Sequence, residues 1–278
     1  MYQLDLLPYY PNLSPKTYHK IYLGNCLEIL PTIPSESIDL VFADPPYNMS
    51  KKKGLGWKYS KHITMEAEWD MFSKDDYFKF NQEWLKEALR VLKHGGSLWI
   101  SGSFHNIYQV GFILQHIEDV KINNSIVWFK PNAQPNITCR MFTESTEHLI
   151  WASKNGEGKR WTFNYEDTKN FEDSINNKGK QTRNVWSIPL TPKKEKWAGA
   201  HPTQKPEELL RRIIIACTKP GETVLDPFVG SGTTSVVAKM LGRNSIGIEK
   251  DKKNMSIINK RLNPPQKEIG EEAEIIIK

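Results

Sequence analysis

The residues most suited to chemistry stand in one short run, Asp44-Pro45-Pro46-Tyr47. A carboxylate, two prolines without an N–H and an aromatic ring form a flat pocket rich in hydrogen-bond acceptors. The Asp44 carboxylate and the Pro45 carbonyl suit the two N–H bonds of an exocyclic amino group. Tyr47 offers a face on which a planar base stacks. The run therefore predicts chemistry on a nucleobase nitrogen.

A second run, residues 224–234, lies far downstream and contains two closely spaced glycines, Gly230 and Gly232. An apolar strand leads into this glycine turn and then into a helix over 235–241, which is how open α/β sheets build a nucleotide crevice. The next apolar run ends in Glu249, 19 positions after Gly230, the separation at which a carboxylate meets ribose hydroxyls. The pattern predicts a nucleoside ligand.

Three kinds of ligand compete for this turn. The phosphate-binding loop of an NTPase needs a lysine after its last glycine, and Thr233 stands there instead. A dinucleotide site needs a third glycine or an alanine where this chain has Ser235. An adenosine ligand without a pyrophosphate therefore fits the turn best.

Together the two runs resemble the S-adenosyl-methionine-dependent amino-methyltransferases of DNA. They stand in the order of the β class, in which the catalytic half precedes the cofactor half. The resemblance covers residues 20–262 and includes the segments 95–103, 128–132 and 201–206. Within the class, the chain most resembles the second adenine methyltransferases of restriction systems that recognise GATC. The segments 105–108 and 196–199 are similar in sequence to theirs.

The resemblance implies an α/β fold: a Rossmann-like, seven-stranded class I methyltransferase sheet that is circularly permuted and carries an inserted target-recognition region. Alternating apolar and amphipathic stretches agree with a mostly parallel sheet covered by helices. We expect the catalytic half at 20–152, the target-recognition insert at 153–200, the cofactor half at 201–262 and an unassigned tail at 263–278. The insert is polar, yet its aromatic residues are too numerous for plain disorder.

Strands and helices are expected where apolar residues follow their respective periods. The strands are predicted at 21–23, 38–43, 97–101, 125–129, 148–152, 224–226 and 245–249. The strand at 148–152 follows its predecessor closely, so we expect the two to pair antiparallel. The helices are predicted near 75–92, 106–118, 206–217 and 235–241, with a last one running toward Leu262.

The resemblance also assigns roles to residues in both halves. The catalytic residues would be the four of the Asp44–Tyr47 run, and Glu249 would bind the ribose. Asn25 stands where the family commonly has aspartate beside the cofactor adenine, and its amide oxygen still accepts a hydrogen bond, without charge assistance. The cofactor-binding residues implied in this way are Asn25, Cys26, Asp44, Lys205, Asp226, Phe228, Gly230, Ser231, Gly232, Thr233, Thr234 and Glu249.

The reaction predicted is methylation of adenine N6. Methylation of cytosine C5 is excluded because it requires a cysteine nucleophile, usually after a proline, and no cysteine of this chain follows one. Methylation of cytosine N4 stays open, although in this family that activity more often has serine in place of Asp44. An asparagine at that position would instead suggest a glutamine-modifying enzyme. The alternative of another class is a nucleic-acid-binding subunit without turnover.

DNA is the expected partner. The 278 residues carry a net charge of +6, which points to a polyanion. A basic flap after the base pocket is predicted to contact phosphates. Arg140 is predicted as a second phosphate contact, and two arginines within the insert are predicted to read guanine edges. The residues concerned are Lys51, Lys52, Lys53, Lys58, Arg140, Arg160 and Arg183. The family setting adds a cognate restriction endonuclease, while single-stranded DNA and a homodimer stay open.

Other features limit the setting of the protein. Cys26, Cys139 and Cys217 are few and far apart, so we expect reduced thiols and neither a disulfide framework nor a metal site. Residues 1–8 hold an acid and a proline where a signal sequence needs a basic start and a long apolar run. No apolar stretch approaches the roughly 20 residues of a membrane span. A cytoplasmic protein without a membrane partner is expected.

Overall fold

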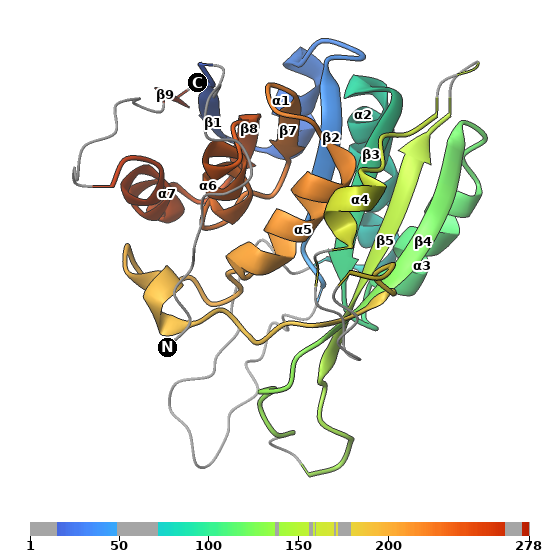
Figure 1. Ribbon diagram of the computed structural model, residues 1–278, viewed down its shortest axis with the longest axis vertical. Coiled ribbons are helices and arrows are strands. Elements are labelled where there is room, and N and C mark those ends of the chain that lie inside the picture. Colours follow the sequence, from blue (N-terminus) through green and yellow to red (C-terminus); the bar gives the residue numbers. More distant parts are fainter. Residues whose placement is uncertain are drawn as a thin grey trace.

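One mixed sheet with helices on both faces forms the centre of the molecule, as a computed structural model shows (Figure 1). The structure describes residues 16–48, 72–136, 139–155, 158, 160–169, 171, 179–264 and 274–277. Within these ranges the sheet has nine strands in the order β6-β4-β5-β3-β2-β7-β8-β1-β9. They are β1 His19–Leu23, β2 Ile38–Ala43, β3 Leu92–Gly102, β4 Val120–Phe129, β5 Thr146–Lys154, β6 Val185–Ser187, β7 Thr223–Asp226, β8 Asn244–Glu249 and β9 Glu274–Ile277.

The seven expected strands form the continuous centre of this sheet, which confirms the predicted fold class. β5 runs antiparallel to both β3 and β4, as its short connection predicted, and the other pairings are parallel. The short strands β6 and β9 extend the sheet at its two edges. β2 of the first half lies directly beside β7 of the second, with Leu40 opposite Val224. The two halves therefore share one sheet.

The helices cover the sheet in two layers. Figure 1 shows α2 and α3 on one side of the sheet, and α5 and α6 on the other. The helices are α1 Cys26–Ile29, α2 Lys74–Val91, α3 Ile107–Gln115, α4 Tyr165–Thr168, α5 Glu207–Cys217, α6 Thr233–Met240 and α7 Met255–Leu262. The 3₁₀ helices are η1 Leu30–Thr32, η3 Lys193–Lys196 and η4 Lys252–Asn254. No helix in the described ranges is long and apolar enough to cross a membrane.

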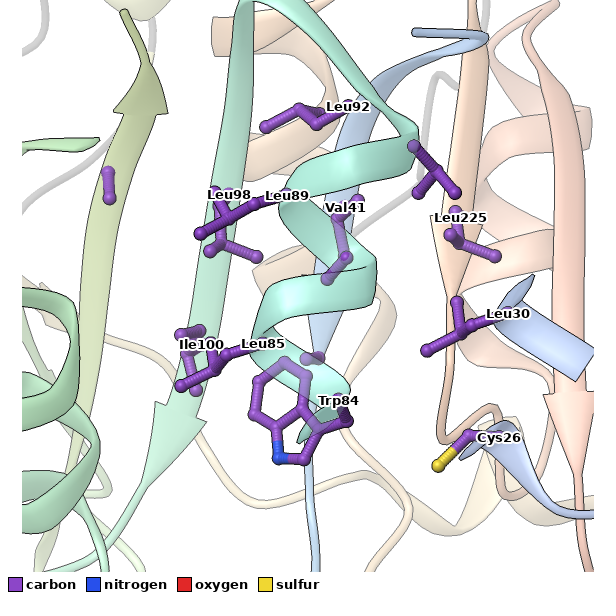
Figure 2. Packing of buried hydrophobic residues seen from close by; sticks show 14 of the residues in the cluster. Cys26, Leu30, Val41, Trp84, Leu85, Leu89, Leu92, Leu98, Ile100 and Leu225 are labelled. Atoms are coloured by element: carbon purple, nitrogen blue, oxygen red, sulfur yellow. The ribbon is translucent and has the colours of Figure 1, made fainter. Parts of the chain in front are cut away.

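The packing of α2 shows how the sequence builds the first layer. Ser73 caps the helix by accepting a hydrogen bond from the Asp76 backbone N–H, which satisfies a donor that the first turn leaves free. The apolar side chains of α2 recur at helical spacing and point toward the sheet, with Trp84 and Leu85 fully buried (Figure 2). Their burial fixes α2 behind β2 and β3, and so fixes where the loop after β2 must run.

The stretch 153–200 is only partly an insert. β5 continues through Lys154, and β6 pairs with the end of β4. Phe171 and Trp186 are buried against the second layer, which explains two of the aromatic residues expected to mark the insert. β4 begins at Val120, five residues before the predicted start. None of its first six residues is buried, so the sequence there carries no buried periodicity that would predict a strand.

Candidate active site

The loop after β2 begins at the carboxyl edge of the sheet and is anchored to α2. The Tyr77 hydroxyl donates a hydrogen bond of 2.6 Å to the carbonyl of Pro46. Asn48 adopts a left-handed backbone, with φ of 55°, and its side-chain oxygen accepts a hydrogen bond of 2.9 Å from the Phe72 N–H. Lys51, Lys52, Lys53 and Lys58 of the expected basic flap lie outside the described residues.

Both carboxylate oxygens of Asp44 already have donors. The Tyr47 hydroxyl lies 2.7 Å from Oδ1 of Asp44, and the Lys205 ammonium lies 2.6 Å from Oδ2. Lys205 also lies over the Tyr47 ring, 5.4 Å from its centroid. The side chain of Lys205 is 9% exposed. Residues from the two ends of the chain therefore form one buried cluster.

A second carboxylate, that of Glu147 at the start of β5, completes this cluster. Its Oε2 lies 3.2 Å from the Tyr47 hydroxyl and 3.4 Å from the Lys205 ammonium. Its Oε1 accepts a hydrogen bond of 3.2 Å from Lys130, directly after β4. The hydroxyls of Tyr47 and Ser101 are 3.1 Å apart. Two carboxylates and two ammonium groups thus balance each other in a largely buried space, as buried charges must.

Burial and these charges act on the pKa of each group. Burial raises the pKa of Asp44, although the Lys205 ammonium opposes this effect. Burial also acts to raise the pKa of Glu147, but Lys205 and Lys130 outweigh it, so the pKa of Glu147 lies below its ordinary value. Burial would lower the pKa of Lys205, yet the two carboxylates raise it above the ordinary value. Lys205 and Glu147 are therefore the charged anchors of the cluster.

The glycine loop between β7 and α6 has the backbone that its sequence requires. Gly230 and Gly232 have φ of 53° and 82°, a left-handed conformation that other residues rarely adopt. Asp226 fastens the loop, because its carboxylate accepts hydrogen bonds from the Phe228 N–H and the Thr234 hydroxyl. Burial raises the pKa of Asp226 to about 7, although the Thr234 hydrogen bond opposes this. Asp226 thus shapes the loop from within.

Arg261 of α7 holds the same loop through several hydrogen bonds. Its guanidinium donates hydrogen bonds to the Ser231 carbonyl at 3.0 Å and to the hydroxyls of Ser231 and Thr233 at 3.1 and 2.8 Å. It also pairs with Glu207, in the first turn of α5, at 2.8 Å. Because α5 begins directly after Lys205-Pro206, Arg261 links the glycine loop to the segment that delivers Lys205.

Two further predicted cofactor residues hold turns beside the loop. The Glu249 carboxylate accepts hydrogen bonds from the Asp251 N–H and from the Asn254 amide, at 2.7 and 3.1 Å. Burial raises its pKa. The Asn25 side-chain oxygen caps α1 by accepting a hydrogen bond of 3.2 Å from the Leu27 N–H. The oxygen expected to meet an adenine amino group therefore already has one donor, and one lone pair is left for a second.

One cavity of about 600 Å³ brings the base loop and the glycine loop together, since Asp44 and Gly230 both line it. Of the predicted residues, Pro45, Tyr47 and Gly232 are not in its wall. The predicted residues that line it are Asn25, Cys26, Asp44, Pro46, Lys205, Asp226, Phe228, Gly230, Ser231, Thr233, Thr234 and Glu249. The two loops, which are remote in sequence, thus face one space.

Two buried polar atoms at this cavity have no hydrogen-bond partner within the described part of the chain: Nδ1 of His201 and Oε1 of Gln204. Burial, with a contribution from Lys205, lowers the pKa of His201 to about 4, so its ring is neutral near pH 7. A buried polar atom without a partner costs about 1–3 kcal/mol. The cavity is therefore suited to a ligand that carries both apolar surface and hydrogen-bonding groups.

The three predicted DNA-contacting arginines within the described ranges lie in different places. Arg140 is exposed in the loop between β4 and β5, which extends from the carboxyl edge of the sheet near Glu147 (Figure 1). Arg183 is exposed two residues before the edge strand β6 begins. Arg160 follows the far end of β5, where Lys154 bonds to the Leu92 carbonyl at the opposite edge of the sheet. The structure does not bring Arg160 to the cavity, because β5 runs antiparallel to its neighbours.

Sequence reasoning did not identify Glu147, Lys130 or Arg261. A signal for the first two was present: if 148–152 pairs antiparallel with 125–129, the start of one strand meets the end of the other. Glu147 and Lys130 must then lie together at the edge that holds Asp44. Arg261 had no such signal, since its partners come from two separate segments, the glycine loop and the start of α5.

Comparison with known proteins agrees with this geometry. The family model described as DNA methylase matches residues 38–260. The chain is 46% identical over 258 residues to the Type II methyltransferase M2.LlaDCHI of Lactococcus lactis subsp. cremoris, and 46% identical over 257 residues to the Type II methyltransferase M2.DpnII of Streptococcus pneumoniae. Each alignment covers 92% of this chain and 92% of the relative.

Solved structures share the fold. The structure of an M1.HpyAVI–SAM complex is 28% identical, with a TM-score of 0.62, and the match covers 88% of this chain and 99% of that one. The cytosine-N4-specific PvuII DNA methyltransferase is 21% identical, with a TM-score of 0.64 and coverage of 91% and 95%, so it shows the fold alone. The chain therefore belongs to the DNA methylase family, and it is a DNA methyltransferase.

Proposed function

We propose that this protein transfers a methyl group from S-adenosyl-methionine to the N6 amino group of an adenine extruded from DNA. The observation that carries the proposal is the shared cavity, which Asp44 and the glycine loop at Gly230 both line. An acceptor for an amine on one wall and a nucleoside-type loop on the other are the two parts that amino methylation requires.

The residues of the chain act on the amine by holding it. The adenine N6 lone pair is delocalised into the ring, so the nitrogen must become tetrahedral before it attacks. Asp44 and the Pro45 carbonyl accept its N–H bonds, which favours that shape and aims the lone pair. The ring of Tyr47 supports the base, and stacking offsets an extrusion cost of a few kcal/mol. Asp44 need not be a strong base, because the methylated nitrogen is cationic and loses its proton easily.

The cavity fits the methyl donor. Its volume is in the usual range for small-molecule sites, about 300–1,000 Å³. The loop at Gly230–Thr233 and the Glu249 carboxylate would hold the donor, and the unpartnered atoms of His201 and Gln204 would meet its polar groups. When bound, S-adenosyl-methionine supplies a methyl group on a positively charged sulfur. The exclusion of water by the buried walls strengthens every charge interaction in the site.

DNA approaches from the carboxyl edge of the sheet. Arg140, on the exposed loop beside Glu147, contacts a phosphate there, while Arg183 reaches DNA from the outer edge strand. We place the enzyme in a restriction–modification system, paired with a cognate endonuclease, with GATC as its target. The resemblance to the second adenine methyltransferases of GATC systems and the similarity to M2.LlaDCHI and M2.DpnII, both named Type II methyltransferases, support this setting.

Product analysis tests the proposal. DNA from cells that express the chain is digested to nucleosides, which are separated and identified by mass. N6-methyladenine is expected, and a methylation-sensitive sequencing map should place it within GATC. If N4-methylcytosine is the only product, the protein is a cytosine-N4 methyltransferase and the proposal is wrong. If N6-methyladenine is found outside GATC, only the proposed recognition sequence is wrong.

A further inference from the structure

Both carboxylate oxygens of Asp44 already accept hydrogen bonds, which hinders the binding of a substrate amine. Oδ1 of Asp44 accepts the Tyr47 hydroxyl, and Oδ2 accepts the Lys205 ammonium. An amine that arrives as a hydrogen-bond donor must displace at least one of these groups. A displaced ammonium or hydroxyl in a buried site needs another acceptor, because a buried donor without a partner is destabilising.

The other carboxylate of the cluster is that acceptor. Oε2 of Glu147 is 3.4 Å from the Lys205 ammonium and 3.2 Å from the Tyr47 hydroxyl, so both groups reach it by small shifts. Tyr47 has a single proton and donates it to one carboxylate at a time. We infer that Glu147 is a positioning residue that takes over Lys205 and Tyr47 when the substrate amine binds, and thereby frees Asp44 for the amine.

The charges around Glu147 suit this exchange. Lys130 donates to Oε1 of Glu147 and leaves Oε2 for the incoming groups. Lys130 and Lys205 lower the pKa of Glu147 and so keep it ionised, and the Glu147 charge in turn helps to raise the pKa of Asp44. The exchange moves no charge into or out of the cluster, because Lys205 stays between the same two carboxylates. It therefore avoids the cost of exposing an unpaired buried charge.

The inference rests on the proposed function only in that the substrate carries an amino group. Glu147 does not line the cavity at the glycine loop, so its neutral variant should bind S-adenosyl-methionine normally. Without the Glu147 charge, Lys205 has Asp44 as its one carboxylate in the cluster and holds it more firmly. The pKa of Asp44 should then fall, since the Glu147 charge contributes to raising it.

The test compares Glu147→Gln with wild type and with Glu144→Gln, a control that removes an exposed acid from the adjacent loop. Measured are the affinity for S-adenosyl-methionine by calorimetry, kcat with duplex DNA, and the pH profile of kcat. For Glu147→Gln we expect unchanged affinity, a kcat lower by about 10- to 100-fold and an acidic limb shifted to lower pH. Glu144→Gln should match wild type in all three.

Glu147→Asp, which keeps the charge, should keep the wild-type acidic limb even if kcat falls. The inference is overturned if Glu147→Gln retains wild-type kcat, or if its kcat falls without a shift of the acidic limb. A loss of S-adenosyl-methionine binding in both Glu147 variants would also overturn it, because that result marks a merely structural role. The product identified with wild type decides the proposed function separately, since either base presents an exocyclic amine to Asp44.

Discussion

Lys205 of the cofactor half and Asp44 of the catalytic half form a buried ion pair of 2.6 Å. The pair adds a second contact between the two halves of the chain, which also meet in the sheet where β2 pairs with β7. It explains how a permuted chain keeps its two loops together: Lys205, two residues before α5, is paired with Asp44, the residue after β2. The pair also makes the base site depend on the cofactor half, in which Arg261 fixes both the glycine loop and α5.

Removal of the Lys205 charge should destabilise the protein. Lys205→Met keeps most of the side-chain volume but leaves Asp44 and Glu147 facing each other, with Lys130 as the one cation of the cluster. We expect the free energy of unfolding to fall by about 3–5 kcal/mol, as for other broken buried pairs. Denaturant titration measures this, and the exposed Lys194→Met is the control, expected within about 0.5 kcal/mol of wild type. Equal stability of Lys205→Met and wild type would argue against the buried pair.

Arg261 should govern cofactor affinity. Arg261→Ala removes the donors for Ser231 and Thr233 and leaves Glu207 without this partner, so the glycine loop loses its outer clamp. We expect the affinity for S-adenosyl-methionine to weaken by about 1–3 kcal/mol, the usual cost of losing buried hydrogen bonds to a charged group. Calorimetry measures the change. The neighbouring exposed Lys260→Ala should bind as wild type does, and equal affinities of all three proteins would refute the clamp.

Asp226 should make stability depend on pH. Its pKa is raised from 3.8 to about 7 in the folded chain, so the folded state binds this proton more tightly than the unfolded state does. Ionisation of Asp226 therefore costs stability as pH rises through that window, by up to about 1.4 kcal/mol per pH unit. Asp226→Asn keeps an acceptor for the Phe228 N–H and removes the charge. Urea unfolding measures the free energy of unfolding of both proteins. The value for Asp226→Asn should rise relative to that of wild type as pH increases from about 4 to about 7.

The exposed Asp75→Asn serves as the control for that measurement. Its stability should follow the wild-type pH curve. If the curves of Asp226→Asn and wild type also run parallel across the window, then the pKa of Asp226 is not raised.

Two arginines test where DNA lies. Arg140 extends from the edge that holds Asp44, whereas Arg160 lies at the opposite edge. Arg140→Ala should weaken DNA binding and lower the slope of log K against log salt by about 0.9, the value for one lost phosphate contact. Arg160→Ala, with the same charge change, should leave both unchanged. Binding is measured over a salt series by fluorescence anisotropy, and the reverse pattern would place DNA on the other side of the sheet.

Much of the fold was predictable because buried strands carry their own signal. β2, β7 and β8 are apolar runs between turns, and each was placed within a residue or so of its observed bounds. The unburied start of β4 and the three residues of β6 were missed, since strand segments at the edge of a sheet need no buried periodicity. The sequence also did not predict how much of 153–200 packs against the core. Trp186 is buried there because β6 pairs with β4, and that pairing could not be predicted from the sequence.

The residues of the site also differ in how far the sequence could predict them. Asp44 and the glycines of the loop stand in short linear runs whose chemistry is local, so the sequence alone marked them as candidates. Lys205 was assigned to the cofactor and lines the cavity beside the glycine loop, but its ion pairs with Asp44 and Glu147 were not predicted. Partnerships of this kind depend on which strand ends meet at the edge of a sheet. They could be predicted only where the strand order was already known.

The most direct test of the account is methyl transfer by Asp44→Ala. Single-turnover transfer of a labelled methyl group from S-adenosyl-methionine to duplex DNA is measured for this variant, for wild type and for the exposed Asp75→Ala. The account predicts that Asp44→Ala still binds S-adenosyl-methionine but is slower than wild type by at least about 100-fold, whereas Asp75→Ala is unaffected. A wild-type rate for Asp44→Ala would contradict the proposed role of the base loop.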